Sequence, residues 1–231
     1  MSAMENVLFV PDVHGRPFWR EAQDRVSEFD QIIFLGDYMD PYPEENVPIM
    51  ADFQALEEIV AFKQAYPEKV TLLLGNHDTH YALDLTPGDR FRSYRKRQFA
   101  AYFNKYMELF RLATVLNVDG VRCLVTHAGV HRDWYERHAE VIGELNAANI
   151  NRAGFADPAI LDEAGRIRYG YHPSGSILWA DLREFDNMVP FEGVYQIFGY
   201  TRQKLGSKPV LKPGLAMIDI QRVVTLAETL V

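Results

Sequence analysis

The stretch LLLGNHD at residues 72–78 places three polar side chains directly after an apolar run. Apolar residues favour burial, whereas an amide, an imidazole and a carboxylate can bind metal ions or carry protons. Gly75 permits a sharp backbone bend between the two parts. We therefore predict that residues 70–74 form a buried strand whose carboxyl end opens into an active site.

Two earlier apolar runs of strand length also end in polar side chains. They are residues 7–10, followed by Asp12 and His14, and residues 32–35, followed by Asp37 and Asp40. The intervening segments predict helices that start near Pro17 and Pro48, which gives the order β-α-β-α-β. Right-handed crossovers make such strands parallel, and ligands bind at the carboxyl ends of parallel strands.

The remainder of the chain predicts further strands. A fourth apolar run at residues 121–126 is followed by His127. Three later runs of strand length lie toward the C-terminus, at residues 194–198, 215–219 and 222–226. An α/β front half and a β-rich back half favour an α/β fold with two sheets packed together and helices outside.

Length and composition are those of a globular chain with a full core. The 231 residues are 48% hydrophobic and 24% charged, which fits one domain over residues 1–231 with helical or loop excursions at about 80–120 and 131–176. The net charge of −8 disfavours binding to long nucleic acids. With no secretory or membrane-spanning pattern and a lone Cys123, we expect a cytoplasmic protein without a membrane partner.

The polar side chains at the strand ends are expected to form one site. Asp12 and His14 alternate along an extended backbone, so they point to the same side. Each short motif is a weak signal by itself. Four of them in this order, each at the end of a predicted strand, are unlikely to coincide by chance.

These segments resemble the motifs of the calcineurin-like metallophosphoesterase family. The matching pieces are residues 12–15 (DVHG), 36–40 (GDYMD), 75–78 (GNHD) and 127–129 (HAG), with weaker matches at 177–181 (ILWAD) and 199–201 (GYT). Within that family they are most similar to the protein serine/threonine phosphatases and the diadenosine tetraphosphate hydrolases. The resemblance runs from about residue 7 to residue 219 and implies a four-layer α/β/β/α sandwich of two mixed sheets.

The resemblance also implies a dinuclear metal centre. Asp12, His14 and Asp37 would bind the first metal ion, with Asp37 bridging to the second, and Asn76 and His127 would bind the second. Mixed carboxylate, amide and imidazole ligands suit Mn²⁺, Fe or Zn²⁺. Two such ions, about 3.5–4 Å apart, would lower the pKa of a bridging water, and the resulting hydroxide would be the nucleophile.

The same resemblance assigns acid catalysis to His77. It would protonate the leaving oxygen, and Asp40 would orient and charge the imidazole. Asp78 is expected to fix the turn by hydrogen bonding. His80 and His131 are the reserve candidates among the other histidines, because each lies within four residues of a motif.

Two positions depart from the family pattern. Tyr200 stands where the family has a histidine ligand of the second metal, and a phenol ligates well only after it loses its proton. We therefore keep Tyr200 as a doubtful ligand and expect a weak, water-completed or absent second metal. Pro41 stands where the serine/threonine phosphatases have a phosphate-binding arginine. Arg16, Arg183 or Arg202 can take its place, and Arg16 is the one we carry forward as a substrate-binding residue.

Two functions follow from these observations. The first is a metal-dependent hydrolase of phosphate esters, acting on a phosphorylated small molecule, a nucleotide or a phosphoprotein. The alternative, motivated by Tyr200 and Pro41, is a non-catalytic or single-metal member that acts as a metal-binding or interaction protein. The loosely matching excursions at 80–120 and 131–176 are expected to decide the substrate.

Overall fold

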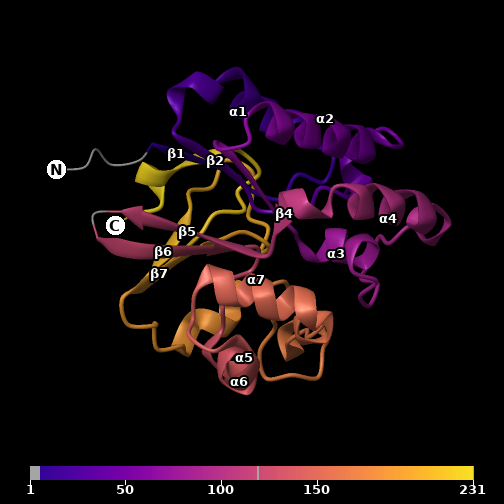
Figure 1. The fold of residues 1–231 in the computed structure, drawn as a ribbon. Coiled ribbons are helices and arrows are strands. Elements are labelled where there is room, and N and C mark those ends of the chain that lie inside the picture. The colour runs from indigo at the N-terminus through magenta and orange to yellow at the C-terminus, as the bar shows by residue number, and fades with distance from the viewer. Residues whose placement is uncertain (1–5, 119, 231) are drawn as a thin grey trace.

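The structure, a computed structural model, describes residues 6–118 and 120–230 and has two mixed five-stranded sheets (Figure 1). The first sheet has the order β10-β1-β2-β3-β4, and the second has the order β5-β6-β7-β9-β8. The strands of the first sheet are β1 (Val7–Val10), β2 (Gln31–Phe34), β3 (Val70–Leu73), β4 (Phe110–Arg111) and β10 (Val224–Thr225). Those of the second are β5 (Ala113–Val118), β6 (Val121–Thr126), β7 (Val194–Phe198), β8 (Val210–Lys212) and β9 (Leu215–Met217).

Helices cover the outer faces of both sheets. They are α1 (Arg20–Asp24), α2 (Ala51–Ala65), α3 (Asn76–Ala82), α4 (Lys96–Lys105), α5 (Arg132–Arg137), α6 (Ala139–Ile142) and α7 (Ala147–Ala156). Figure 1 shows α1 and α2 on one side and α5 to α7 on the other, with the sheets between them. This is the expected α/β/β/α sandwich. In the described part of the chain, no helix is long and apolar enough to cross a membrane.

Successive side chains of β1 point to opposite faces of the sheet, so they belong to two different layers of the core. Val7 and Phe9 pack between the sheets, whereas Leu8 and Val10 pack against the helices. Strands that are buried on both faces read as continuous apolar runs, which is why the sequence marks β1, β2 and β3 so clearly. The β1–β2 and β2–β3 pairs are parallel, as predicted, so their carboxyl ends share one edge of the sheet.

The C-terminal half of the chain contributes strands to both sheets. The last strand, β10, returns to the first sheet and pairs antiparallel with β1. Strands β4 and β5 lie at 110–118, inside the stretch where we expected helix and loop. Aromatic residues at helical spacing continue from α4 to Phe110, so the sequence pattern does not distinguish the two-residue strand β4 from the helix. Strand β4 is too short for a periodic signal. Strand β10 lies within the run predicted at 222–226, but its pairing with the first sheet was not predicted.

Candidate active site

The strand ends bring the predicted site residues together at one edge of the two sheets. They are Asp12 and His14 after β1, Asp37 and Asp40 after β2, Asn76 and His77 after β3, His127 after β6 and Tyr200 after β7. All of these side chains are buried. Residues up to 188 positions apart thereby make direct contact, as in the 3.2 Å hydrogen bond from the Tyr200 N–H to Asp12 Oδ1.

Four of these residues have a left-handed backbone. The φ angles of His14, Asp37, Asp40 and Tyr200 are 45°, 53°, 59° and 68°. Non-glycine residues adopt this region rarely, and the conformation persists only where the surrounding structure holds it. The sharp turns direct the side chains at the strand ends inward.

Asp12, His14 and Asp37 form the first possible metal-binding group. One ligand atom from each lies within 4.8 Å of the others. His14 Nδ1–H donates to the Met39 carbonyl at 2.6 Å, which leaves Nε2 free to bind a cation, 3.3 Å from Asp37 Oδ2. Burial lowers the pKa of His14 although Asp37 opposes it, and the neutral ring is the metal-binding form. The donor set fits a divalent transition metal.

Asp37 lies between the two predicted metal positions. Its Oδ1 accepts the His77 N–H at 2.9 Å and is 3.7 Å from His127 Nε2. Burial raises the pKa of Asp37, but the nearby His127, His77 and His14 outweigh this and hold it well below its usual range. The carboxylate is therefore ionised and faces ligands of both positions.

Asn76 and His127 form the second possible metal position. His127 Nδ1–H donates to the Leu35 carbonyl at 2.8 Å, and its Nε2 lies 3.0 Å from Asn76 Oδ1. In a neutral ring with this tautomer, Nε2 and the amide oxygen both present lone pairs. Two acceptors that face each other beside a carboxylate suit a bound cation.

Tyr200 lies beside this second position without an ionised oxygen. Its ring centre is 5.4 Å from that of His127, and the Arg168 guanidinium carbon is 4.5 Å from the Tyr200 ring centre. Burial raises the pKa of Tyr200 well above the usual tyrosine value. The phenol therefore keeps its proton at neutral pH, the form that ligates metals poorly.

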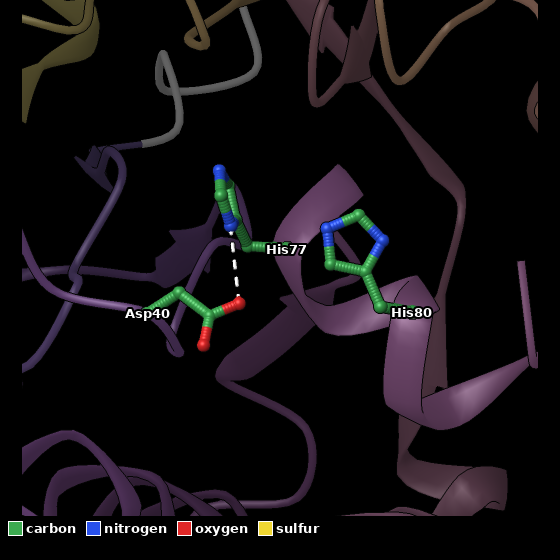
Figure 2. Close-up of side chains that lie close together, drawn as sticks. All are labelled: Asp40, His77 and His80. Atoms are coloured by element: carbon green, nitrogen blue, oxygen red, sulfur yellow. Dashed lines mark hydrogen bonds and ion pairs between the residues drawn. The ribbon is translucent and has the colours of Figure 1, made fainter. Parts of the chain in front are cut away.

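His77 and Asp40 form a buried hydrogen-bonded pair (Figure 2). His77 Nδ1 lies 3.2 Å from Asp40 Oδ2. The other oxygen, Asp40 Oδ1, accepts the Tyr81 hydroxyl at 2.7 Å and faces Arg92 Nε at 3.3 Å. The carboxylate is thus held from both sides, and His77 Nε2 is left for other partners.

The polar residues after β3 start helix α3 instead of lying in a simple turn. Asp78 holds this helix start, as expected: it accepts the backbone N–H groups of Gly75 at 2.9 Å, Asp37 at 2.7 Å and Tyr38 at 2.9 Å. A Cβ at Gly75 would lie 2.2 Å from Asp37 Oδ1. Glycine is therefore required here by the close approach of the two strand ends.

The two reserve histidines have different surroundings. His80 lies close to the His77–Asp40 pair (Figure 2), and one ligand atom from each of the three lies within 4.8 Å of the others, so this group could also hold a metal ion. His80 Nε2 accepts the Gly88 N–H at 3.2 Å. Burial lowers the pKa of His80 to about 4. His131 accepts the Asp133 N–H at 3.2 Å and so caps α5.

A cavity of about 750 Å³ opens over these groups. Asp37, Asn76, His77 and Tyr200 contribute to its wall, together with residues 86–90, several residues between 162 and 172, and Trp179. The two excursions therefore line the cavity. Its arginines, Arg90 and Arg168, were missed by the sequence reasoning, because a loop position carries no periodic signal of what it faces.

The three arginines considered from sequence are held elsewhere. Arg16 donates to the carbonyls of Asp12 at 3.0 Å and Val13 at 3.2 Å, and it does not line the 750 Å³ cavity. Arg183 pairs with Asp181 at 2.8 Å, and Arg202 pairs with Glu44 at 3.3 Å and with Glu45. Arg183 and Arg202 line a smaller hollow of about 380 Å³ that shares Tyr42, Arg168 and Tyr200 with the cavity.

Fold and donor set together define a metal-binding α/β protein of the phosphoesterase class. The chain belongs to the calcineurin-like phosphoesterase family, whose sequence profile matches residues 5–189. No curated protein matches the sequence.

A solved structure supports the fold. A protein serine/threonine phosphatase from Saccharomyces cerevisiae, with similarity to human phosphatase PP5, matches with a TM-score of 0.54 at 13% identity, over 94% of this chain and 67% of that chain. Hypothetical protein PH1004 from Pyrococcus horikoshii OT3 (TM-score 0.38, 13% identity, 54% and 55% coverage) and protein AQ665 of unknown function from Aquifex aeolicus (0.33, 10%, 96% and 96%) are too distant to support an argument.

Proposed function

We propose that the protein is a metal-dependent hydrolase of phosphate esters. The observation that carries this proposal is the convergence of two possible metal positions beside the His77–Asp40 pair in one cavity. Asp12, His14 and Asp37 form the first. Asn76 and His127 form the second, where His127 Nε2 lies 3.0 Å from Asn76 Oδ1 and 3.7 Å from Asp37 Oδ1. Asp12, His14 and Asp37 would hold one metal ion, and Asn76 and His127 would hold a second with Asp37 between them. Mn²⁺, Fe and Zn²⁺ suit this mixture of donors.

Metal ions bound there would supply positive charge for the phosphoryl oxygens and lower the pKa of a coordinated water. The residues of the chain supply the rest of the chemistry. His77 Nδ1–H donates to Asp40, so the ring keeps Nε2 directed toward the cavity and can pass a proton from Nε2 to the departing oxygen. Asp40 stabilises the charged imidazole that precedes this transfer.

Metal content and hydrolysis test the proposal together. Purified protein loaded with Mn²⁺ is expected to hydrolyse aryl phosphate mono- or diesters or dinucleoside polyphosphates. Elemental analysis is expected to find at least one metal ion per chain, with the second bound weakly because Tyr200 keeps its proton. One metal ion per chain with hydrolysis would indicate a single-metal enzyme. Less than one ion and no hydrolysis would favour the alternative, an interaction protein built on this fold.

Replacing Tyr200 with histidine is expected to strengthen the second metal site. An imidazole beside His127 adds a neutral nitrogen donor where the phenol keeps its proton. Calorimetric titration with Mn²⁺ should show tighter binding of the second ion in Tyr200→His. Tyr200→Phe is the matched control and should bind like the wild-type protein. Equal affinities in all three proteins would mean that this position does not face the metal.

A further inference from the structure

We propose that Arg90 binds the phosphoryl group of the substrate. When the substrate enters, the Arg90 guanidinium leaves its contact with His77 Nε2 and contacts the phosphoryl oxygens instead. The inference rests on the proposed function. It is carried by the position of the guanidinium in the cavity, next to the nitrogen that faces the leaving group.

Arg90 occupies the place where a leaving oxygen has to lie. Its Nη2 is 2.8 Å from His77 Nε2, and its Nη1 donates to the Asp40 carbonyl oxygen. Arginine has no acceptor, so His77 Nε2 accepts in this contact. A leaving group that takes a proton from Nε2 needs this position, and Arg90 must therefore move when substrate binds.

The cavity offers the displaced guanidinium a better partner than the one it leaves. Hydrogen bonds from arginine to phosphate are charge-assisted and often bidentate, and they exceed the bond to a neutral imidazole. The Arg90 side chain is only 13% exposed, so water competes little for it. Its Nε pairs with Asp89 at 3.3 Å, but the Asp89 side chain is 77% exposed, so solvent weakens this ion pair. Its guanidinium carbon lies 3.8 Å from the Tyr42 ring centre, which supports the planar group from one side.

The loop around Arg90 is fixed on both sides, while Arg90 itself has a strained backbone. Thr86 Oγ1 donates to Asp162 at 2.6 Å, the Gly88 N–H donates to His80 at 3.2 Å, and Arg92 Nε lies 3.3 Å from Asp40 Oδ1. Between these anchors Arg90 has a φ of 63°. Strain of this kind persists where the surroundings impose it, and it accumulates at ligand-binding sites. His80 is thereby a positioning residue for the loop.

Arg168, the other arginine of the cavity wall, is placed differently. Its Nε pairs with Asp181 at 2.8 Å and its guanidinium lies over the Tyr200 ring. Arg16 does not line the cavity, and its guanidinium donates to the backbone carbonyls of Asp12 and Val13. Among the described residues that line the cavity, Arg90 is the arginine in contact with His77.

Phosphate affinity tests the role of Arg90 without relying on turnover. Mn²⁺-loaded wild-type protein, Arg90→Met and Arg90→Lys are titrated with inorganic phosphate by calorimetry. We expect Arg90→Met to weaken phosphate binding about 10–100-fold, the range for loss of a charge-assisted contact, and Arg90→Lys to weaken it less. Arg20→Met is the control: Arg20 pairs with Glu58 on the helical surface and should leave phosphate affinity unchanged.

Several outcomes separate this inference from the proposed function. Unchanged phosphate affinity in Arg90→Met with normal metal content would overturn the inference, and so would a wild-type protein that binds no phosphate. Weaker phosphate binding in the variant, in a protein that hydrolyses nothing, would support Arg90 and contradict the hydrolase. If Arg90→Met does not fold, Arg90→Lys carries the test with an expected loss of about 3–10-fold. In an active enzyme the KM for an aryl phosphate should rise with the phosphate Kd.

Discussion

Replacing Asp37 with asparagine is expected to abolish tight metal binding and to lower phosphate-ester hydrolysis by about 10²–10³-fold or more, the loss typical of removing one essential electrostatic group. Asp37 is the carboxylate that faces both possible metal positions, 3.3 Å from His14 Nε2 and 3.7 Å from His127 Nε2. Asparagine has the same shape and can still accept the His77 N–H, but it carries no charge. The substitution therefore removes the charge that both positions share.

The metal-free variant should be somewhat less stable than the wild-type protein. Burial raises the pKa of Asp37, but contacts with His127, His77 and His14 outweigh it and hold the pKa well below its usual range, so the negative charge is favourable in the folded protein at neutral pH. Asparagine cannot supply this charge. This loss is separate from the loss of stabilisation by added metal.

Thermal unfolding with and without Mn²⁺ separates these two effects. A ligand at 100 times its Kd stabilises a protein by about 2.7 kcal/mol, so the wild-type Tm should rise with Mn²⁺ and that of Asp37→Asn should not. Asp24→Asn, an exposed position at the end of α1, is the control and should respond like the wild-type protein. A full Mn²⁺-dependent rise in Asp37→Asn would contradict the shared role of this carboxylate.

The strand ends could be predicted from sequence because burial and chemistry change abruptly there. Runs such as residues 7–10 are apolar at every position, since both faces of the strand are covered, and a polar motif then follows at once. Parallel pairing brings the motifs to one edge. The sandwich and the grouping of Asp12, His14 and Asp37 follow from this local pattern and the handedness of crossovers.

The cavity wall could not be predicted in the same way. Arg90 faces His77 because its loop is anchored by hydrogen bonds from Thr86, Gly88 and Arg92 to other segments. These segments have no periodic pattern, or lie far from the loop in the sequence, so the contacts cannot be read from the sequence. The sequence offers Arg16, Arg183 and Arg202 without a pattern that chooses among them, and we carry Arg16 forward. Its guanidinium instead contacts the carbonyls of its own turn.

Replacing His77 with glutamine is expected to lower hydrolysis by an amount that depends on the leaving group. General acid catalysis contributes about 10²–10⁴-fold when the departing oxygen is strongly basic, as in an alkyl phosphate. A nitrophenolate is weakly basic and leaves without a proton. We therefore expect a large loss of kcat on alkyl phosphates and a much smaller loss on nitrophenyl phosphate.

Metal content distinguishes this effect from damage to the metal site. The polar partners of the His77 ring are Asp40 and Arg90, with Asp89 3.6 Å from Nε2. Towards the proposed metal ligands, the ring packs edge-on against His14 and the backbone N–H donates to Asp37, so the ring itself supplies no ligand atom to either proposed metal position. His77→Gln should therefore retain the metal content of the wild-type protein. Asp40→Asn should show the same leaving-group pattern with a smaller loss, because it weakens the support of the imidazole and leaves the ring in place.

His138→Gln is the matched control for the loss of a histidine. His138 pairs with Glu163 at 2.9 Å, outside the cavity wall. The His138→Gln protein should hydrolyse both substrates at the wild-type rate. An equal loss on alkyl and nitrophenyl phosphates in His77→Gln, with normal metal content, would show that His77 positions the substrate and does not protonate it. A dependence on the leaving group that becomes steeper when His77 is removed requires a proton donor at Nε2, because neither a metal ligand nor a purely steric residue distinguishes the two oxygens by their basicity.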